Sequence, residues 1–204
     1  MQRSLVHVVI LALVLISAPA PAVTAQEATP PAAETDRPAC ATTLGAAGTP
    51  TAADDADLAG WQTVPLTDAR TGDAFTVGDF LGCAVFVDMM ATWCPSCRQQ
   101  MEYVAAAAKE LDPDQFVFLS ISVETELVNK DLARYADDAS FDWRFSVATP
   151  DALKAIVDEF GREAILPPSV PHVIVEPDGT YGDLHTGYSE PDEIVELMKA
   201  AAAA

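Results

Sequence analysis

Apolar residues in the C-terminal three quarters of the chain form two kinds of pattern. The stretches 83–89 and 115–123 are almost continuously apolar, which is typical of strands buried on both faces of a sheet. Between them, from residue 95 onward, apolar side chains recur at helical spacing until the Asp-Pro-Asp at 112–114. The pattern therefore predicts a buried strand, a helix and a second buried strand in succession.

The rest of this part of the chain continues the alternation. The pattern predicts, in chain order, a hairpin over 61–80, a helix face over 127–136, a short strand over 143–148, a helix over 150–160 ended by Gly161, a strand and a returning strand over 171–187, and a helix over 191–204. Strands that alternate with helices, followed by an antiparallel hairpin and a closing helix, indicate an α/β fold. We expect a mixed central sheet flanked by helices.

The first 57 residues lack this pattern and divide into two segments. Residues 1–25 carry an early Arg, an apolar run over 5–16 and then small residues, which predicts a signal peptide or an N-terminal anchor. Residues 26–57 are rich in Ala, Thr, Pro and acid, as expected of a flexible tether. The folded domain is then 58–204. We expect an exported protein, extracytoplasmic or secreted, which an uncleaved first segment would hold at the membrane.

The formal net charge of −20 limits the partners of this protein. So acidic a chain is repelled by nucleic acid and by anionic membrane surfaces, which argues against both as binding partners. The acids are scattered along the sequence, which favours a solvated surface over a dedicated cationic partner.

Two of the four cysteines form a close pair, Cys94-Pro95-Ser96-Cys97. A structural zinc site needs four ligands, and only one close pair is present. A disulfide across two intervening residues would restrict the unfolded chain little, so stabilisation is a poor explanation. Cys94 follows a buried strand and precedes a helix, whose free N–H groups and dipole favour the thiolate. These features indicate redox exchange, with Cys94 as nucleophile and Cys97 as resolving thiol.

The other two cysteines, Cys40 and Cys83, cannot belong to the same centre. Cys83 begins the strand that leads to Cys94, and eleven extended residues separate the two by roughly 20–35 Å. In an exported protein with an even number of cysteines, Cys40 and Cys83 form the natural structural disulfide. Two unpaired thiols are the alternative.

The segment "VDMMATWCPSC" together with the later "SVPHVIVEPDG" resembles the thioredoxin superfamily, and most closely its exported TlpA/ResA-type oxidoreductases. The resemblance implies a βαβ-like insertion between the active-site helix and a cis-proline at Pro171, which is preceded here by Val170. Pro171 would pack against the disulfide and shape the peptide-binding groove, and Val170 would contact the substrate. The resemblance also implies that Asp88 is a buried acid that moves the proton of Cys97.

The same resemblance suggests which residues contact the substrate. Trp93 would shield the disulfide and offer a docking face. His172 follows the expected cis-proline and would lie at the rim of the site, either near partner and thiol or simply exposed at the strand edge. The Pro95-Ser96 dipeptide departs from the usual pairs, which leaves the direction of electron flow open.

These features predict an exported thiol–disulfide oxidoreductase that reduces disulfides in client proteins. We expect a monomer without cofactor or bound metal, which takes electrons from a membrane-embedded or other thiol donor. The alternative is a copper chaperone for respiratory oxidase assembly with Cys94, Cys97 and His172 as ligands. A peroxidase is disfavoured because Ala91 occupies the position where peroxiredoxins place Thr.

Overall fold

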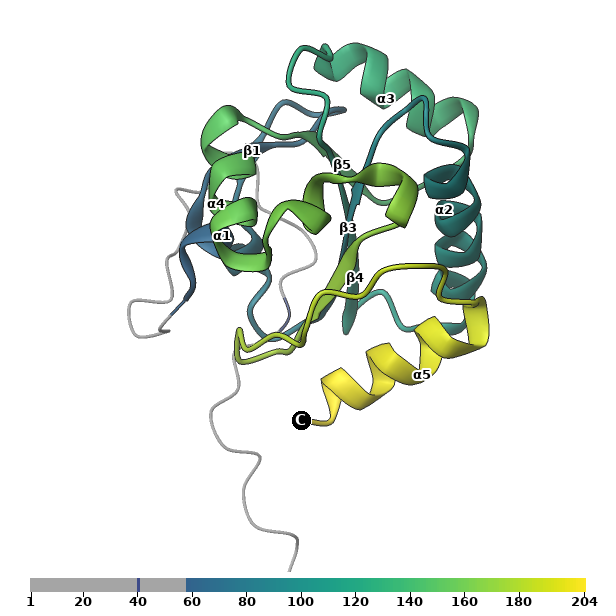
Figure 1. Cartoon of the computed structure of the whole chain (residues 1–204). Helices are drawn as coiled ribbons and strands as arrows, with labels where there is room; N and C mark the ends of the chain where they lie inside the picture. Colours follow the sequence, from purple (N-terminus) through teal and green to yellow (C-terminus); the bar gives the residue numbers. More distant parts are fainter. Residues whose placement is uncertain (1–39, 41–57) are drawn as a thin grey trace, which may run out of the picture. The chain divides into compact units, whose positions relative to one another are not determined.

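The computed structural model describes Cys40 and residues 58–204, so the predicted segment 1–25 and, except for Cys40, the segment 26–57 lie outside the described residues. Figure 1 shows a central sheet with helices on both faces. The strands of this sheet, in spatial order, are β5 (Arg144–Val147), β4 (Phe116–Ser122), β3 (Ala84–Met90) and β6 (His172–Val175). A separate two-stranded sheet consists of β1 (Leu66–Thr67) and β2 (Ala74–Phe75).

Strand directions in the central sheet are mixed. Strand β3 runs parallel to β4 with Asp88 opposite Ser120, and β4 runs parallel to β5. Strand β6 runs antiparallel to β3 and places His172 opposite Asp88. Strands β1 and β2 pair antiparallel, which confirms a hairpin within the predicted range 61–80, but short helices over Gly60–Thr63 and Val77–Phe80 occupy the two ends of that range. The predicted α/β fold with a mixed central sheet is confirmed.

Five α-helices accompany the strands in the part of the chain that the structure describes. They are α1 (Gly60–Thr63), α2 (Pro95–Ala107), α3 (Asn129–Asp138), α4 (Pro150–Phe160) and α5 (Pro191–Ala202). Four short 3-10 helices are η1 (Val77–Phe80), η2 (Ala108–Glu110), η3 (Arg162–Ile165) and η4 (Pro167–Ser169). Helix α3 connects the parallel strands β4 and β5, which gives the βαβ-like unit expected after the active-site helix.

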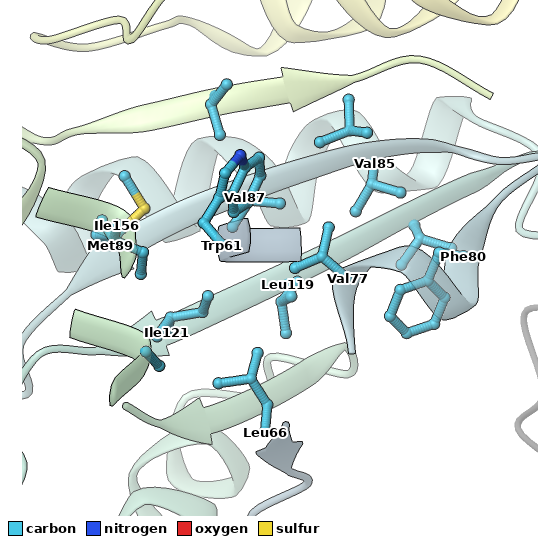
Figure 2. Packing of buried hydrophobic residues seen from close by; sticks show 14 of the residues in the cluster. Trp61, Leu66, Val77, Phe80, Val85, Val87, Met89, Leu119, Ile121 and Ile156 are labelled. Atoms are coloured by element: carbon cyan, nitrogen blue, oxygen red, sulfur yellow. The ribbon is translucent and has the colours of Figure 1, made fainter. Parts of the chain in front are cut away.

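The core has two sides because successive residues of β3 point to opposite faces of the sheet. On one face, Val85, Val87 and Met89 pack with residues of α1, η1 and α4 (Figure 2). On the other face, Phe86 packs against α2 and α5, and Met90 packs beside Cys94, Cys97 and α3. All seven residues of β3 are buried, which agrees with a continuously apolar central strand.

The C-terminal hairpin differs from its prediction in two ways. The returning strand is reduced to isolated bridges between His172 and His185 and between Val175 and Tyr181. The expected cis peptide bond before Pro171 is wrong, since no peptide bond among the described residues is cis. Instead Val170 adopts a left-handed conformation with φ 54°, and the chain turns there into β6.

A disulfide joins Cys40 to Cys83, whose Cα atoms lie 4.6 Å apart. Cys83 is fully buried immediately before β3, and Cys40 packs against the same side of the core as Val85. Among the described residues, no helix is both long and apolar enough to cross a membrane.

Replacing Cys40 by Ser should lower the free energy of unfolding by about 4 kcal/mol under non-reducing conditions. The physical reason is that the bond closes a ring with a sequence separation of 43, which restricts the unfolded chain. Urea unfolding of the oxidised wild type and of Cys40→Ser measures the difference. After reduction of both proteins the difference should vanish, and equal stability before reduction would contradict a stabilising role.

Candidate active site

Cys94 and Cys97 lie at the start of α2 and form a disulfide with Cα atoms 5.4 Å apart. Cys94 is the N-cap of the helix, and its Sγ accepts a hydrogen bond of 3.1 Å from the backbone N–H of Cys97. Pro95 occupies the first helical turn, where its fixed φ suits the helix and its missing N–H is not needed. Free N–H groups at this helix end favour a thiolate on Cys94 when the disulfide is reduced.

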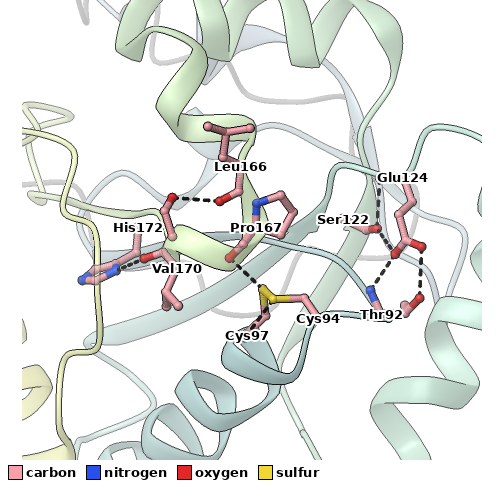
Figure 3. Close-up of a disulfide and its surroundings, with 10 residues drawn as sticks. Thr92, Cys94, Cys97, Ser122, Glu124, Leu166, Pro167, Val170 and His172 are labelled. Atoms are coloured by element: carbon pink, nitrogen blue, oxygen red, sulfur yellow. Dashed lines mark hydrogen bonds between the residues drawn. A yellow bond between two sulfur atoms is a disulfide. The ribbon is translucent and has the colours of Figure 1, made fainter.

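The 3-10 helix η4 lies against the disulfide and contacts it through Pro167. The Sγ atom of Cys97 lies 3.2 Å from the carbonyl oxygen of Pro167, as Figure 3 shows. Cys94 and Cys97 are 1% and 2% exposed, and Val170 and Pro171 are also buried. The carbonyl oxygen of Pro171 accepts a hydrogen bond from the N–H of Met89, which fixes this segment to the end of β3. The site therefore contains a nearly inaccessible sulfur pair between two chain segments.

A tight turn leads from β3 to Cys94. The backbone N–H of Cys94 donates to the carbonyl oxygen of Ala91 over 3.1 Å, so residues 91–94 form a β-turn between β3 and α2. Trp93 occupies this turn and is 61% exposed, whereas its neighbour Cys94 is buried. The indole therefore faces solvent directly beside the disulfide.

Asp88 is a carboxylic acid inside the core, 4% exposed. Burial raises its pKa to about 7, and a hydrogen bond from the Ser120 hydroxyl to Oδ1, 2.6 Å long, partly opposes the shift. The Trp143 indole N–H donates to Ser120 Oγ over 2.8 Å and continues the chain of hydrogen bonds. Asp88 alternates with Val87 and Met89, so it lies on the face of β3 that also carries Phe86, Met90 and the α2 contacts.

His172 does not lie at the rim of the site, and that prediction is wrong. Its side chain is 1% exposed and stacks on Phe86 at 4.9 Å between ring centroids. Its Nδ1 lies 3.1 Å from the Val170 carbonyl oxygen, and its Nε2 lies 3.1 Å from Ser189 Oγ. Because a carbonyl only accepts, Nδ1 carries the proton and Nε2 accepts from the hydroxyl. Burial lowers the pKa of His172, and Figure 3 shows its ring directed away from the sulfur atoms.

Several polar contacts near the site were not predicted from the sequence. Ser120, which binds Asp88, is one of two serines in the largely apolar strand β4, so its polarity alone does not single it out. Gln100 is buried on α2, and its side-chain amide exchanges two hydrogen bonds with the backbone of Ser189, 2.9 and 3.0 Å long. Gln100 follows Cys97 by three residues, so these bonds fix the helix of the reactive pair to the segment before α5.

Within the described part of the chain, no group of three or more His, Cys, Asp or Glu side chains is arranged to hold a metal ion. In particular, both ring nitrogens of His172 have protein partners, as described above. The three-ligand copper site considered from the sequence would require His172 to turn out of the core.

The family to which this chain belongs follows from a comparison of its sequence with models of known protein families. Residues 58–164, more than half of the 204, match the model of the AhpC/TSA family. The chain belongs to the AhpC/TSA family. With a thioredoxin-like fold and the Cys94–Cys97 pair, this member is a thiol–disulfide oxidoreductase of the thioredoxin superfamily, as the sequence predicts. No curated protein matches the sequence.

Solved structures with the same fold include thioredoxin-like proteins from several bacteria. The MTB dsbF structure, in mixed oxidised and reduced forms, has a TM-score of 0.54 and 17% identity over 71% of this chain and 99% of that one. The exposed lipoprotein thioredoxin of Streptococcus pneumoniae has a TM-score of 0.53 and 19% identity, covering 67% and 98%. A thiol:disulfide interchange protein of Chlorobium tepidum has a TM-score of 0.54 and 18% identity, covering 68% and 92%. Together they establish the fold.

The raised pKa of Asp88 predicts a pH-dependent stability that Asp88→Asn removes. Between pH 4 and 7 the folded protein keeps a proton on Asp88 that the unfolded chain has released, so stability falls as pH rises. Relative to Asp88→Asn, the wild type should lose roughly 2–3 kcal/mol of unfolding free energy between pH 5 and 8. Urea unfolding at several pH values measures this loss. The exposed Asp73→Asn is the control, and parallel pH curves for wild type and Asp88→Asn would contradict the assignment.

Proposed function

We propose that this protein is an exported reductase of disulfides in client proteins. The observation that carries the proposal is the Cys94–Cys97 disulfide at the N-terminus of α2, where the helix favours a Cys94 thiolate. Export rests on the signal-like sequence of residues 1–25. Two of the similar structures are named as an exposed lipoprotein and as a thiol:disulfide interchange protein, which agrees with both parts of the proposal.

The reaction consists of two exchanges. The Cys94 thiolate attacks one sulfur of the client disulfide, forms a mixed disulfide and releases the first client thiolate. Cys97 then loses its proton and attacks Cys94 Sγ, which forms the Cys94–Cys97 disulfide and releases the second client thiolate. Two electrons pass from the pair to the client. A dithiol donor, membrane-embedded or soluble, returns them by the same chemistry in reverse.

Asp88 is proposed as the acceptor of the Cys97 proton. A general base works best when its pKa lies near the operating pH, and burial raises the pKa of Asp88 to about 7. Asp88 lies on the same face of β3 as Met90, and Met90 packs in one cluster with Cys97, which supports this proposal. The hydroxyl of Ser120 orients the carboxylate, since it donates to Oδ1.

The client is proposed to dock on apolar side chains around the turn. Trp93 precedes Cys94 and is mostly exposed, and Leu166 precedes Pro167 and is half exposed. Such exposed aromatic and aliphatic groups bind partners with little loss of side-chain entropy. Val170 and Pro171 are buried, so neither belongs to this exposed apolar surface.

The Cys97→Ser variant should trap the mixed disulfide. Because Ser cannot resolve it, a client mixed with reduced Cys97→Ser should remain bound through Cys94, visible as a heavier species on non-reducing electrophoresis. Cys94→Ser is the matched control and should trap nothing. If Cys94 in the reduced wild type resists alkylation and Cys97→Ser forms no adduct, the proposal is overturned.

The Asp88→Asn variant should slow the second exchange. General-base catalysis contributes about 10²-fold or more, so resolution at pH 7 should slow by at least about tenfold. Reduced protein is mixed with a disulfide peptide, quenched with acid at intervals and analysed by mass. Asp88→Asn should accumulate the Cys94 mixed disulfide transiently, whereas Asp73→Asn should behave like the wild type. Equal accumulation in all three would remove Asp88 from the mechanism.

A further inference from the structure

We propose that Glu124 is a positioning residue for Cys94, because its carboxylate holds the turn that presents this cysteine. The inference rests on the proposed exchange chemistry of Cys94. Glu124 lies just after β4, outside the Cys94–Cys97 motif, and is separated by 32 positions in sequence from the residue that it binds, Thr92.

Two hydrogen bonds join Glu124 to Thr92. The backbone N–H of Thr92 donates to Glu124 Oε2 over 2.6 Å, and the Thr92 hydroxyl donates to Oε1 over 3.1 Å. The Ser122 hydroxyl donates to Oε2 over 3.2 Å and fixes the carboxylate from its own side (Figure 3). Both carboxylate oxygens are therefore engaged, and hydrogen bonds to an ionised acceptor are stronger than neutral ones.

These bonds act on the turn itself. Residues 91–94 form the β-turn closed by the Cys94 N–H and the Ala91 carbonyl oxygen, and Thr92 is the first of its two central residues. The Thr92 N–H has no partner within such a turn, and Glu124 supplies one. The Val123 N–H also donates to the Met90 carbonyl oxygen over 2.9 Å, so the chain around Glu124 runs beside the end of β3. Fixing Thr92 fixes the direction in which Trp93 and Cys94 leave the strand.

The substitution Glu124→Gln tests this role with little change in volume. In an amide one of the two carboxylate oxygens is replaced by an NH2 group, which only donates, so one of the two positions that now accept from Thr92 is lost. The matched control is Glu126→Gln, which removes one negative charge from an exposed position two residues away.

The first measurement is the rate of attack by fully ionised Cys94 on a small aromatic disulfide, with Cys97→Ser as the common background. Glu124→Gln should lower this rate constant by roughly threefold to tenfold, since a misplaced nucleophile loses orientation. Glu126→Gln should stay within twofold of the background. A rate for Glu124→Gln equal to that of Glu126→Gln would overturn the proposal.

A double-mutant cycle tests whether Glu124 acts through Thr92. Thr92→Val removes the hydroxyl contact while keeping shape and backbone N–H. If Glu124 and Thr92 act as one unit, the double variant loses less than the product of the two single losses. Losses that multiply would show that Glu124 does not act through the Thr92 hydroxyl, and would overturn the claim that both contacts with Thr92 hold the turn.

The pH dependence of Cys94 alkylation separates positioning from a loss of general stability. Removing a negative charge bound two residues from the thiolate should move the alkylation midpoint to lower pH. A Glu124→Gln variant with a weakened unfolding transition and an unchanged alkylation midpoint would overturn the proposal. These readouts use only Cys94 chemistry, so they stand even if wild-type protein fails to reduce protein disulfides such as those of insulin, an outcome that would reject the proposed function alone.

Discussion

Burial of strand β3 on both faces is the constraint on which the remaining structure depends. All seven of its residues are buried, with β4 on one side, β6 on the other and helices over both faces. The strand can neither slide nor rotate without exposing one of its two apolar sets. Its ends are therefore fixed points, and a cysteine lies at each: Cys83 before the strand and Cys94 beyond the turn that follows it. One end anchors Cys40, and the other holds the reactive pair.

Several polar groups buried beside this strand are hydrogen-bonded to neighbouring groups. Asp88 accepts from Ser120, Ser120 accepts from Trp143, and Gln100 is paired with the backbone of Ser189. Burying a polar group costs free energy unless it is hydrogen-bonded, so each of these contacts offsets part of that cost. The contacts also join β3 to β4 and α2 to the segment before α5. Rigidity around Cys94 and Cys97 therefore has polar as well as apolar sources.

The sequence predicts the order of elements and the place of Cys94 and Cys97 because periodicity and local signals such as Pro95 act over a few residues. It fails where the outcome depends on long-range packing. His172 looks like a rim residue from its place after Pro171, yet register with β3 puts it against Phe86. The returning strand reaches β6 only through isolated bridges, between His172 and His185 and between Val175 and Tyr181. Glu124 is one acid among many in an acidic chain, and only the fold brings it to Thr92.

Asp88 in β3 and Glu124 just after β4 are both carboxylates, and their surroundings favour different roles. Asp88 accepts from one side-chain hydroxyl and lies inside the core, so burial dominates and raises its pKa to about 7. Such an acid can hold or release a proton at neutral pH. Glu124 is only half-buried and accepts from a backbone N–H and two hydroxyls, all directed at its two oxygens. Those donors make it an anchor for the turn. The two carboxylates differ in their surroundings because of their places in the sheet. Asp88 lies inside β3, whereas Glu124 lies past the end of β4.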